Sequence, residues 1–270
     1  MCIRDSHRRS TVATAASLLR GVGQTTQRLP SNSSGLAASG PTRSVPAIGW
    51  QATNAPGRSF GSTEAIAREL DKAALVFDVG SVKSAAIASV EPKLRPGAYV
   101  ACHPIAGTER VGPDAASPLL FEGKRCVICP TPRSNEQNVA VVERLWTAMG
   151  AEPVRMNAQL HDRVFGASSH LPHVAAYALA AALGQLAPDV IEGIQRLPTS
   201  SLRDTTRVAA SSPAMWRDIL LDNRAEVVPL IEALAGCVQE LRAAVAAGDA
   251  DRIEKLLVAG KTGRDRFIGG

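Results

Sequence analysis

The regular alternation of short apolar segments with helical ones, and its end near Asn157, constrains the fold of this chain more than any other feature. Between residues 63 and 157, four segments are short, apolar and bounded by polar or glycine-containing turns, which is typical of buried strands. The predicted strands are residues 74–78, 99–102, 125–129 and 153–156, and the predicted helices are residues 64–72, 82–93 and 134–149, the last capped by Ser134. Strands that alternate with helices predict a parallel α/β sheet.

After Asn157 the sequence predicts helices only. Residues 158–186 read as one long helical region interrupted near Pro172, and Ser212 before Pro213 has the pattern of an N-cap followed by a first-turn proline. Beyond Asn223, apolar residues are spaced 4, 3, 4, 3 and 4 apart, which is an a/d seam that Gly248 ends before Asp249 starts a last helix. The seam predicts packing against another helix, either in the same chain or in a second copy; its members are Val227, Ile231, Leu234, Val238, Leu241 and Val245.

The first 63 residues differ in composition from the rest. They hold 17 Ser or Thr residues and show no sustained periodicity, so we predict an irregular segment. Their seven arginines and one acidic residue give a balance of +6, whereas the remaining 23 basic and 24 acidic residues give −1. One interpretation is that the segment is an organelle transit peptide, which it resembles in composition. The interpretation that we favour is that this start is not native coding sequence. The predicted folded part has no basic excess that would indicate nucleic acid.

Cysteine usage and hydropathy indicate in which cellular compartment the protein is expected to lie. The five cysteines are odd in number and sparse, which favours a reducing compartment, with the cytoplasm as the default. Cys126 and Cys129 form a CxxC pattern, but they lie in a predicted strand that would send them to opposite faces, so we interpret them as structural thiols. No apolar run approaches the roughly 18 residues of a membrane span, so we expect no membrane partner.

Four of the five histidines lie between residues 103 and 173, which suggests a site. His170 and His173 are three residues apart and would share a helix face, as zinc ligands often do. The nearby carboxylate of Asp162 is two turns away, and the sequence contains no HExxH or similar ligand set. We therefore predict no metal site.

Three polar blocks each leave a structural and a functional interpretation open. The loop of residues 78–83 follows a predicted strand, where Gly80 permits close approach and Ser81 either holds an anion or caps the next helix. His103 ends the next strand and is either a loop histidine or a general base near neutral pH. Arg207 either pairs with a substrate carboxylate or forms an internal ion pair with Asp204.

Taken together, five blocks carry a resemblance to a known family. They are Asp-Val-Gly-Ser-Val-Lys at 78–83, His-Pro-Ile-Ala-Gly-Thr-Glu at 103–109, His-Asp at 161–162 with Ser-His-Leu-Pro-His at 169–173, Leu-Arg-Asp-Thr-Thr-Arg at 202–207, and Ser-Pro-Ala-Met-Trp at 212–216. In order and spacing they resemble the prephenate/arogenate (cyclohexadienyl) dehydrogenase family of tyrosine biosynthesis. The resemblance runs from about Thr63 to about Asp249.

The resemblance implies an α/β part followed by an all-α part. After the irregular residues 1–63, residues 64–157 would form a partial Rossmann-type dinucleotide-binding domain, and residues 158–270 an all-helical substrate and dimerisation domain. The implied activity is the NAD- or NADP-dependent oxidative decarboxylation of prephenate to 4-hydroxyphenylpyruvate, or of arogenate to tyrosine. The implied protein is a cytoplasmic homodimer, a plastid location being the less favoured one.

The resemblance also implies roles for individual residues. His103 would take the proton of the substrate's C4 hydroxyl, with Ser81 beside it and near the nicotinamide. The loop residues Asp78, Gly80, Ser81 and Lys83 would contribute to the cofactor site. The substrate would be bound by Thr108, Glu109, His173, Arg207 and Trp216.

One departure from the family pattern concerns the glycine-rich dinucleotide loop, which should precede Asp78. The nearest candidate, Gly-Val-Gly-Gln-Thr-Thr at residues 21–26, lacks the third glycine and follows no apolar strand. We therefore expect the family's N-terminal part to be incomplete, cofactor affinity to be weakened and this chain to be inactive or poorly active. A catalytically inactive fragment that acts only as a helical dimerisation module is the alternative.

Overall fold

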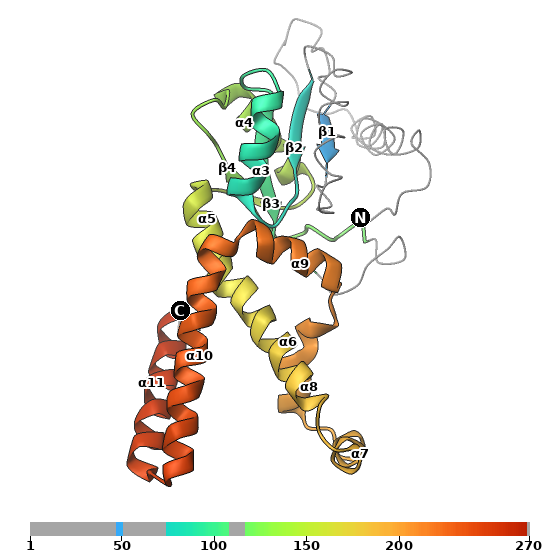
Figure 1. The fold of residues 1–270 in the computed structure, drawn as a ribbon. Helices are drawn as coiled ribbons and strands as arrows, with labels where there is room; N and C mark the ends of the chain where they lie inside the picture. Colours follow the sequence, from blue (N-terminus) through green and yellow to red (C-terminus); the bar gives the residue numbers. More distant parts are fainter. Residues whose placement is uncertain (1–46, 51–73, 108–116, 269–270) are drawn as a thin grey trace, which may run out of the picture.

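The computed structural model describes residues 47–50, 74–107 and 117–268, and it has a sheet part and a helical part (Figure 1). The sheet has five strands in sequence order: β1 (Ala47–Trp50), β2 (Leu75–Asp78), β3 (Tyr99–Pro104), β4 (Arg125–Cys129) and β5 (Glu152–Arg155). An α/β part is thus followed by a helical part, as predicted. Strand β1, however, lies in the stretch that we expected to be irregular, and the predicted helix 64–72 lies outside the described residues.

Three of the four strand pairings are parallel, as the alternating pattern predicted. The exception is the antiparallel pair β3–β4, in which Ala101 faces Cys129 and His103 faces Val127. The described residues between these strands, 105–107 and 117–124, contain turns and no helix. Parallel neighbours need a long crossover connection, whereas antiparallel neighbours do not. The sheet is therefore mixed.

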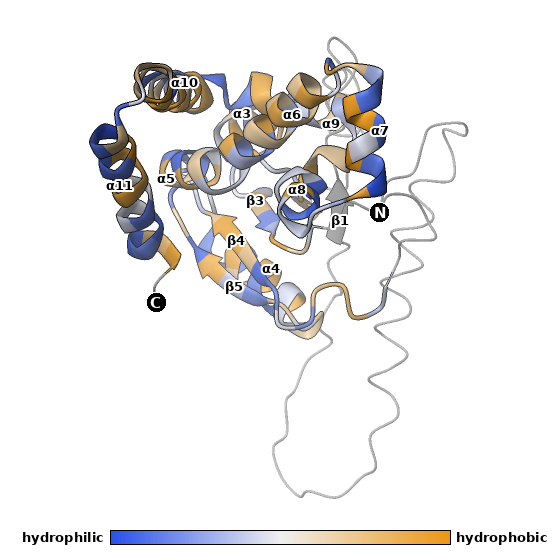
Figure 2. Ribbon diagram, turned by 90° about the horizontal axis from the view of Figure 1, so that it is seen from below, coloured by the Kyte–Doolittle hydropathy of each residue, from blue (hydrophilic) through white to orange (hydrophobic). Residues whose placement is uncertain are grey.

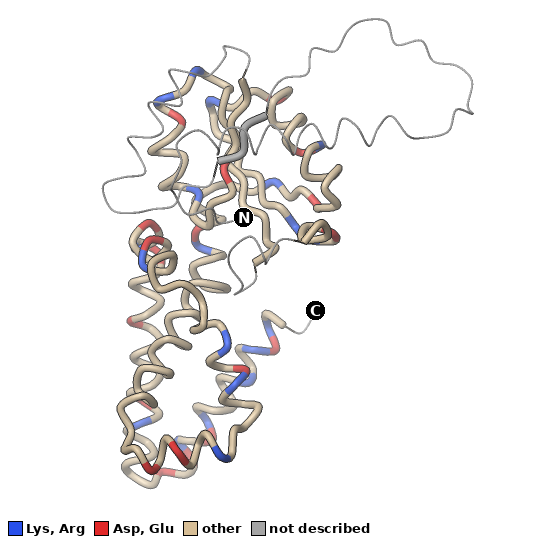
Figure 3. The backbone as a smooth tube through the Cα atoms, turned by 90° about the vertical axis from the view of Figure 1, so that its right-hand side faces the viewer, with Lys and Arg blue, Asp and Glu red and all other residues tan. Residues whose placement is uncertain are grey.

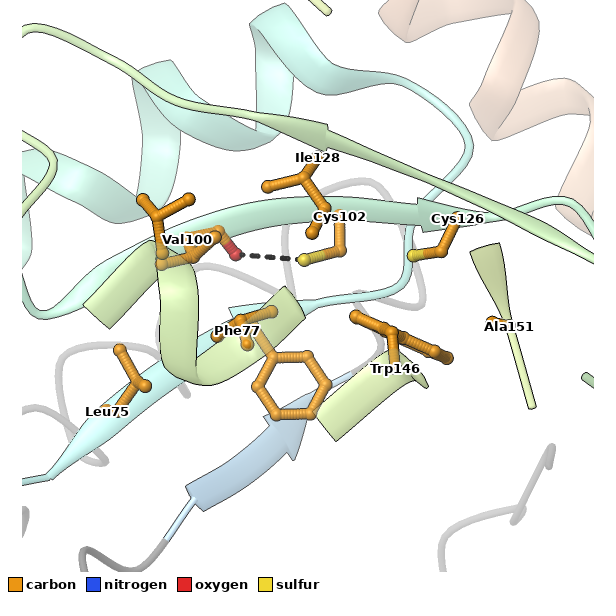
Figure 4. Close-up of a cluster of buried hydrophobic side chains, with 10 residues drawn as sticks. Leu75, Phe77, Val100, Cys102, Cys126, Ile128, Trp146 and Ala151 are labelled. Carbon is orange, nitrogen blue, oxygen red and sulfur yellow. Dashed lines mark hydrogen bonds between the residues drawn. The ribbon is translucent and has the colours of Figure 1, made fainter. Parts of the chain in front are cut away.

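Helices α3 (Lys83–Val90) and α4 (Glu136–Ala148) cover opposite faces of the sheet, and the strand residues alternate between two apolar clusters. On the α4 face, Trp146 meets Phe77 edge-on at 6.0 Å between ring centroids (Figure 4). Cys126 lies in this cluster and Cys129 in the one on the α3 face, both as buried free thiols. The prediction that the two cysteines point to opposite faces is confirmed.

The cap of α4 differs by one residue from the prediction. Asn135, not Ser134, is the N-cap, and its side chain accepts hydrogen bonds from the amides of Gln137 at 2.9 Å and Asn138 at 3.3 Å. Ser134 Oγ instead accepts from the amide of Thr131 at 2.9 Å and closes the preceding turn. Both residue types cap well, so the local sequence does not distinguish between them.

The helical part begins with α5 (Ala158–Phe165), which passes through a π-helical turn (Gly166–His170) into α6 (Leu171–Leu183). The predicted interruption is this π turn, and Pro172 lies harmlessly in the first turn of α6. The remaining helices are α7 (Pro188–Arg196), α8 (Ser200–Thr206), a 3-10 turn (Arg207–Ala210), α9 (Pro213–Asp222), α10 (Arg224–Ala247) and α11 (Ala250–Ile268).

Two legs extend from the sheet part (Figure 1). One contains α6, α7 and α8, and the other is the antiparallel pair of α10 and α11. The predicted N-cap of α9 and the predicted end of α10 are confirmed: Ser212 accepts from the amide of Met215, and Gly248 ends α10 in the left-handed conformation at φ 66°. Val227 of the seam is buried, but Val238 and Val245 remain 56% and 61% exposed. The second leg thus keeps apolar surface that α11 does not cover.

Charge and hydropathy follow the same division. Acidic and basic residues are interspersed along the helices (Figure 3), and strand β4 is largely hydrophobic whereas α11 mixes hydrophilic and hydrophobic positions (Figure 2).

Among the described residues, no single helix has both the length and the apolar character of a membrane span. One sharply bent pair, Ala158–Leu183 with Pro188–Arg196, meets those criteria by length and composition only.

Candidate active site

The loop after β2 is organised around the buried carboxylate of Asp78. One of its oxygens accepts hydrogen bonds from Tyr99 Oη at 3.0 Å and from the amide of Cys102 at 2.9 Å, and the other accepts from the amide of Gly80 at 3.0 Å and pairs with Lys83 Nζ. Lys83 also donates to the carbonyl of Cys102 at 2.5 Å and is fully buried. Asp78 and Lys83 therefore hold the loop against the sheet from within.

The first turn of α3 is capped by a residue from another part of the chain. Its N-cap is Val82, whose apolar side chain cannot accept a hydrogen bond from the helix amides. The carboxylate of Asp162 on α5 instead accepts from the amides of Lys83 and Ser84, both at 2.8 Å. The structural interpretation of Ser81 as a helix cap is therefore wrong. Ser81 lies half-buried just before the capped turn.

A chain of three side chains leads from this cap to His103. Asp162 Oδ1 lies 2.8 Å from His161 Nδ1, and His161 Nε2 lies 2.8 Å from His103 Nδ1. His161 and Asp162 are 0% and 3% exposed, whereas His103 is half-buried. Phe165 packs against both imidazole rings, with centroids 4.8 Å from His103 and 4.5 Å from His161. The network thus joins β3 of the sheet to α5.

Burial, together with the charges around it, keeps the His103 ring neutral. Desolvation is the largest cause that lowers the pKa of His103 well below its usual value, and the positive charge of Lys83 adds to it. Burial alone would raise the pKa of Asp162, but hydrogen bonds from His161 and from the first turn of α3 outweigh it and lower the pKa to about 2. At neutral pH the network therefore contains an ionised Asp162 and an uncharged His103.

A second group of predicted residues gathers beside the same turn. Trp216 on α9 packs against Val82, the residue after Ser81, and its indole stacks on His173 of α6 with centroids 3.6 Å apart and ring planes 23° apart. His173 Nδ1 lies 2.8 Å from the carbonyl oxygen of Ser169. Among the described residues, the buried Nε1 of Trp216 has no hydrogen-bond partner.

Arg207 lies close enough to the stack of His173 and Trp216 for its positive charge to affect the pKa of His173. Burial is the largest cause that lowers the pKa of His173, and the positive charge of Arg207 lowers it further. Arg207 is exposed at the start of the 3-10 turn that follows α8. A cation beside a stacked aromatic pair suits the binding of an acid that carries an apolar ring.

The structure thus brings most of the predicted residues into one neighbourhood. Thr108 and Glu109 lie outside the described residues. The sequence did not assign site roles to His161, Asp162 or Asn223. Asn223 Nδ2 donates to the carbonyl of Asp162 at 2.9 Å and lies 3.0 Å from His170 Nδ1. The adjacent His-Asp pair was a visible signal, but its partners are 58 and 79 residues away along the chain.

The described residues fit one end of a dinucleotide better than the other. A glycine and a serine hydroxyl at the carboxyl end of β2 suit the nicotinamide ring, which is a cation in the oxidised cofactor, because the neighbouring His103 is uncharged. A Cβ at Gly80 would come within 3.1 Å of Asp78 Oδ2, so this close approach favours glycine. The amides at the start of α3 are already bound to Asp162 and are not free to bind a pyrophosphate.

Comparison with known proteins agrees with this architecture. Residues 59–155 match the sequence model of the prephenate dehydrogenase nucleotide-binding domain, and residues 157–259 match that of the prephenate dehydrogenase dimerization domain. The chain is 36% identical to a cyclohexadienyl dehydrogenase of Zymomonas mobilis over 197 residues, which are 73% of this chain and 67% of that protein. It is 32% identical to a prephenate dehydrogenase of Bacillus subtilis over 71% of this chain, but spans only 52% of that relative.

The fold is also similar to that of solved structures. A prephenate dehydrogenase from A. aeolicus, crystallised with hydroxyphenyl propionate and NAD+, superposes with a TM-score of 0.70 at 32% identity. The match covers 82% of this chain and 76% of that one. Two family domains in the expected order, together with these relatives, show that the chain belongs to the prephenate dehydrogenase family.

Proposed function

We propose that this chain is an NAD(P)-dependent oxidoreductase that converts prephenate to 4-hydroxyphenylpyruvate, or arogenate to tyrosine, by oxidative decarboxylation. The observation that carries the proposal is the neutral His103, bound through one ring nitrogen to His161 and adjacent to the loop of Ser81. The nicotinamide, when bound, supplies the hydride acceptor for ring C4. The protein side chains supply the base, the orientation and the carboxylate recognition.

His103 serves as the general base in this proposal. An uncharged imidazole can accept the proton of the C4 hydroxyl as that carbon is oxidised. The lowered pKa of His103 means that the ring is already unprotonated at neutral pH. Ser81 orients the hydroxyl and faces the nicotinamide with Gly80, whereas Asp78 and Lys83 support the loop through their buried ion pair. No metal is required, because aromatisation drives the loss of CO2.

The helical part contributes the remaining substrate contacts. Arg207 pairs with a substrate carboxylate, and the stack of His173 on Trp216 forms an apolar wall for the ring. By resemblance to the family, we propose that Thr108 and Glu109 also contact the substrate.

The proposal includes a homodimer formed through the helical part. Residues 157–259 match a dimerization domain, and α10 keeps Val228, Val238 and Val245 exposed along one leg. Apolar residues in this number on a long helix are typical of a surface that a partner covers. The four free thiols of the described residues fit a reducing compartment, so we place the protein in the cytoplasm. We propose no nucleic-acid or membrane partner.

Turnover tests the proposal directly. The chain would be incubated with NAD+ or NADP+ and with either prephenate or arogenate, and the absorbance of NAD(P)H followed. We expect His103→Asn to lower kcat by about 10²- to 10⁴-fold, the range typical of a lost general base. Glu192→Gln, which alters only an exposed ion pair on α7, should leave kcat unchanged.

A second protein tests whether an incomplete glycine-rich loop limits turnover. It carries a complete dinucleotide-binding domain grafted before Thr63. Turnover by the grafted protein alone would support the assigned site and assign the deficit to cofactor binding. If both proteins are folded and neither turns over, the enzyme proposal fails, and the chain is better described as a helical dimerisation module.

A further inference from the structure

We propose that His161 and Asp162 are positioning residues that fix the tautomer of His103, so that its Nδ1 carries the proton and its Nε2 is left as the bare, proton-accepting nitrogen. The inference rests on the proposed function only in making Nε2 the catalytic base. The tautomer itself follows from the hydrogen-bond network.

The argument starts at Asp162, which can only accept. Its two oxygens each accept a backbone amide of α3 at 2.8 Å, and it is ionised at neutral pH. The ring nitrogen 2.8 Å from Oδ1, His161 Nδ1, must therefore be a donor. Because the carboxylate is held by two amides and 3% exposed, it cannot turn away to release this constraint.

The same reasoning extends to the next ring. A neutral His161 with its proton on Nδ1 has only an acceptor at Nε2. The nitrogen 2.8 Å from it, His103 Nδ1, must then donate. A neutral His103 with its proton on Nδ1 has a lone pair on Nε2, so the network delivers the base in the form that proton abstraction needs.

The network also helps once the proton has moved. When the O–H bond of the C4 hydroxyl breaks, its electron pair stays on oxygen and the proton forms a new bond to His103 Nε2. The resulting imidazolium keeps its Nδ1–H directed at His161, whose other nitrogen faces the negative Asp162. A carboxylate that acts through an imidazole in this way stabilises the charged ring without taking the proton itself.

Helix capping alone does not account for the arrangement. The cap of α3 needs only the carboxylate of Asp162, whereas His161 is fully buried and makes its second contact with the base. The charged and titratable groups that surround His103 are Lys83 from α3, His161 and Asp162 from α5, and His170 from the π turn. Within the described part of the chain, only His161 of these groups is hydrogen-bonded to the His103 ring, so it alone can set the tautomer.

Two substitutions at His161 separate positioning from packing. His161→Leu fills the space but removes the acceptor, whereas His161→Gln offers a carboxamide oxygen to His103 Nδ1. Chains labelled with 15N-histidine report the protonated nitrogen of His103 by NMR, without substrate or cofactor, and a His103→Gln chain assigns its signals. We expect Nδ1–H in the parent and in His161→Gln, and a mixture of tautomers in His161→Leu.

Kinetics on whichever form of the chain turns over give the second readout. We expect His161→Leu to lower kcat by about 10- to 100-fold, a range typical of lost supporting contacts to a functional histidine, with little change in KM. His161→Gln should restore most of the loss. A merely structural role would lower folded yield or stability without changing the tautomer or splitting kcat from KM.

Each outcome bears on a different claim. Finding the Nε2–H tautomer in the parent chain overturns the inference whether or not the chain turns over, and so does a His161→Leu variant with unchanged tautomer and kcat. If the expected tautomer is found but neither substrate reacts, the inference stands and the proposed function fails. Should His161→Leu not fold, the parent spectrum and His161→Gln still decide.

Discussion

At the residue scale, Asp162 combines two tasks that are usually separate. It caps α3 through two backbone amides, and it orients the imidazole chain that ends at His103. Both tasks need an ionised carboxylate, since only that form accepts in all three directions. Its charge is maintained by hydrogen bonds that outweigh the cost of burial.

This coupling predicts a pH-dependent loss of stability. The pKa of Asp162 is lowered to about 2 in the folded chain, so the unfolded carboxyl takes up its proton first as the pH falls. The stabilisation amounts to about 2 kcal/mol above about pH 4, and it is lost as the pH falls from about 4 to 2. Asp162→Asn should lower the free energy of unfolding by about that amount at pH 7, because a carboxamide oxygen cannot serve both amides.

Urea unfolding at a series of pH values measures the effect. The difference between the parent and Asp162→Asn should shrink as the pH falls below 4. Asp189→Asn, which removes an exposed carboxylate on α7, serves as the control and should show no such convergence. A difference that stays constant down to pH 2 would show that the charge of Asp162 does not stabilise the fold.

At the element scale, the end of α10 depends on one glycine. Gly248 has φ 66°, a left-handed conformation that disfavours any residue with a Cβ, although a Cβ there would meet nothing within 4 Å. Gly248→Ala should therefore destabilise the chain by about 1 kcal/mol through backbone strain alone. Gly193, inside α7, also has open space around its position but lies in an ordinary helical turn.

The two glycine-to-alanine substitutions are expected to change the free energy of unfolding in opposite directions. Gly193→Ala should stabilise by about 0.5 to 1 kcal/mol, because alanine favours the helix and restricts the unfolded chain. Thermal unfolding of both variants against the parent measures the two changes. Equal shifts in the same direction would mean that the turn between α10 and α11 does not require the left-handed conformation.

Local signals of this kind are what the sequence predicts well. The bounds of β4, the cap at Ser212 and the stop at Gly248 all depend on residues within one turn, and all three are confirmed. The cap of α3 could not be found in this way, because its acceptor lies 79 residues further along the chain. The antiparallel pairing of β3 with β4 was missed for a related reason, since strand direction depends on the connection and not on strand composition.

The residues of the candidate site also fall into those that local sequence predicts and those whose role depends on distant contacts. His103, His173 and Trp216 were predicted as site residues because their residue types follow strand ends or recur in family motifs, and these roles stay predictions. His161 was visible only as one of four clustered histidines, and its role depends on a contact between the sheet and α5. Spacing along a chain does not show which ring nitrogen faces which acceptor.

At the scale of the whole molecule, the second leg is the surface that we expect a second copy to cover. Val238 lies near the middle of α10 and is 56% exposed. A charge buried there without a partner would cost several kcal/mol of association free energy. Val238→Glu should therefore shift a dimer to monomers in sedimentation-velocity measurements at micromolar concentration.

The neighbouring Gln239 provides the matched control. Gln239→Glu introduces the same charge one position away, at a residue that is already polar and exposed. It should leave the sedimentation coefficient unchanged. A parent chain that sediments as a monomer, or a Val238→Glu variant that stays dimeric, would contradict dimerisation through this leg.

The bond between Asp162 and the first turn of α3 also determines where the molecule can bend. The matched domains divide between residues 155 and 157, which places α5 with the helical part. Mechanically, α5 moves with the sheet, because its carboxylate and its two neighbouring imidazoles are fixed to α3 and β3. Rotation of the leg of α6, α7 and α8 against the sheet is accommodated more easily at the π turn (Gly166–His170), whose backbone is already wider than an α-helix. His103, His161 and Asp162 then move as one body, and the leg of α6, α7 and α8 carries His173 towards or away from them.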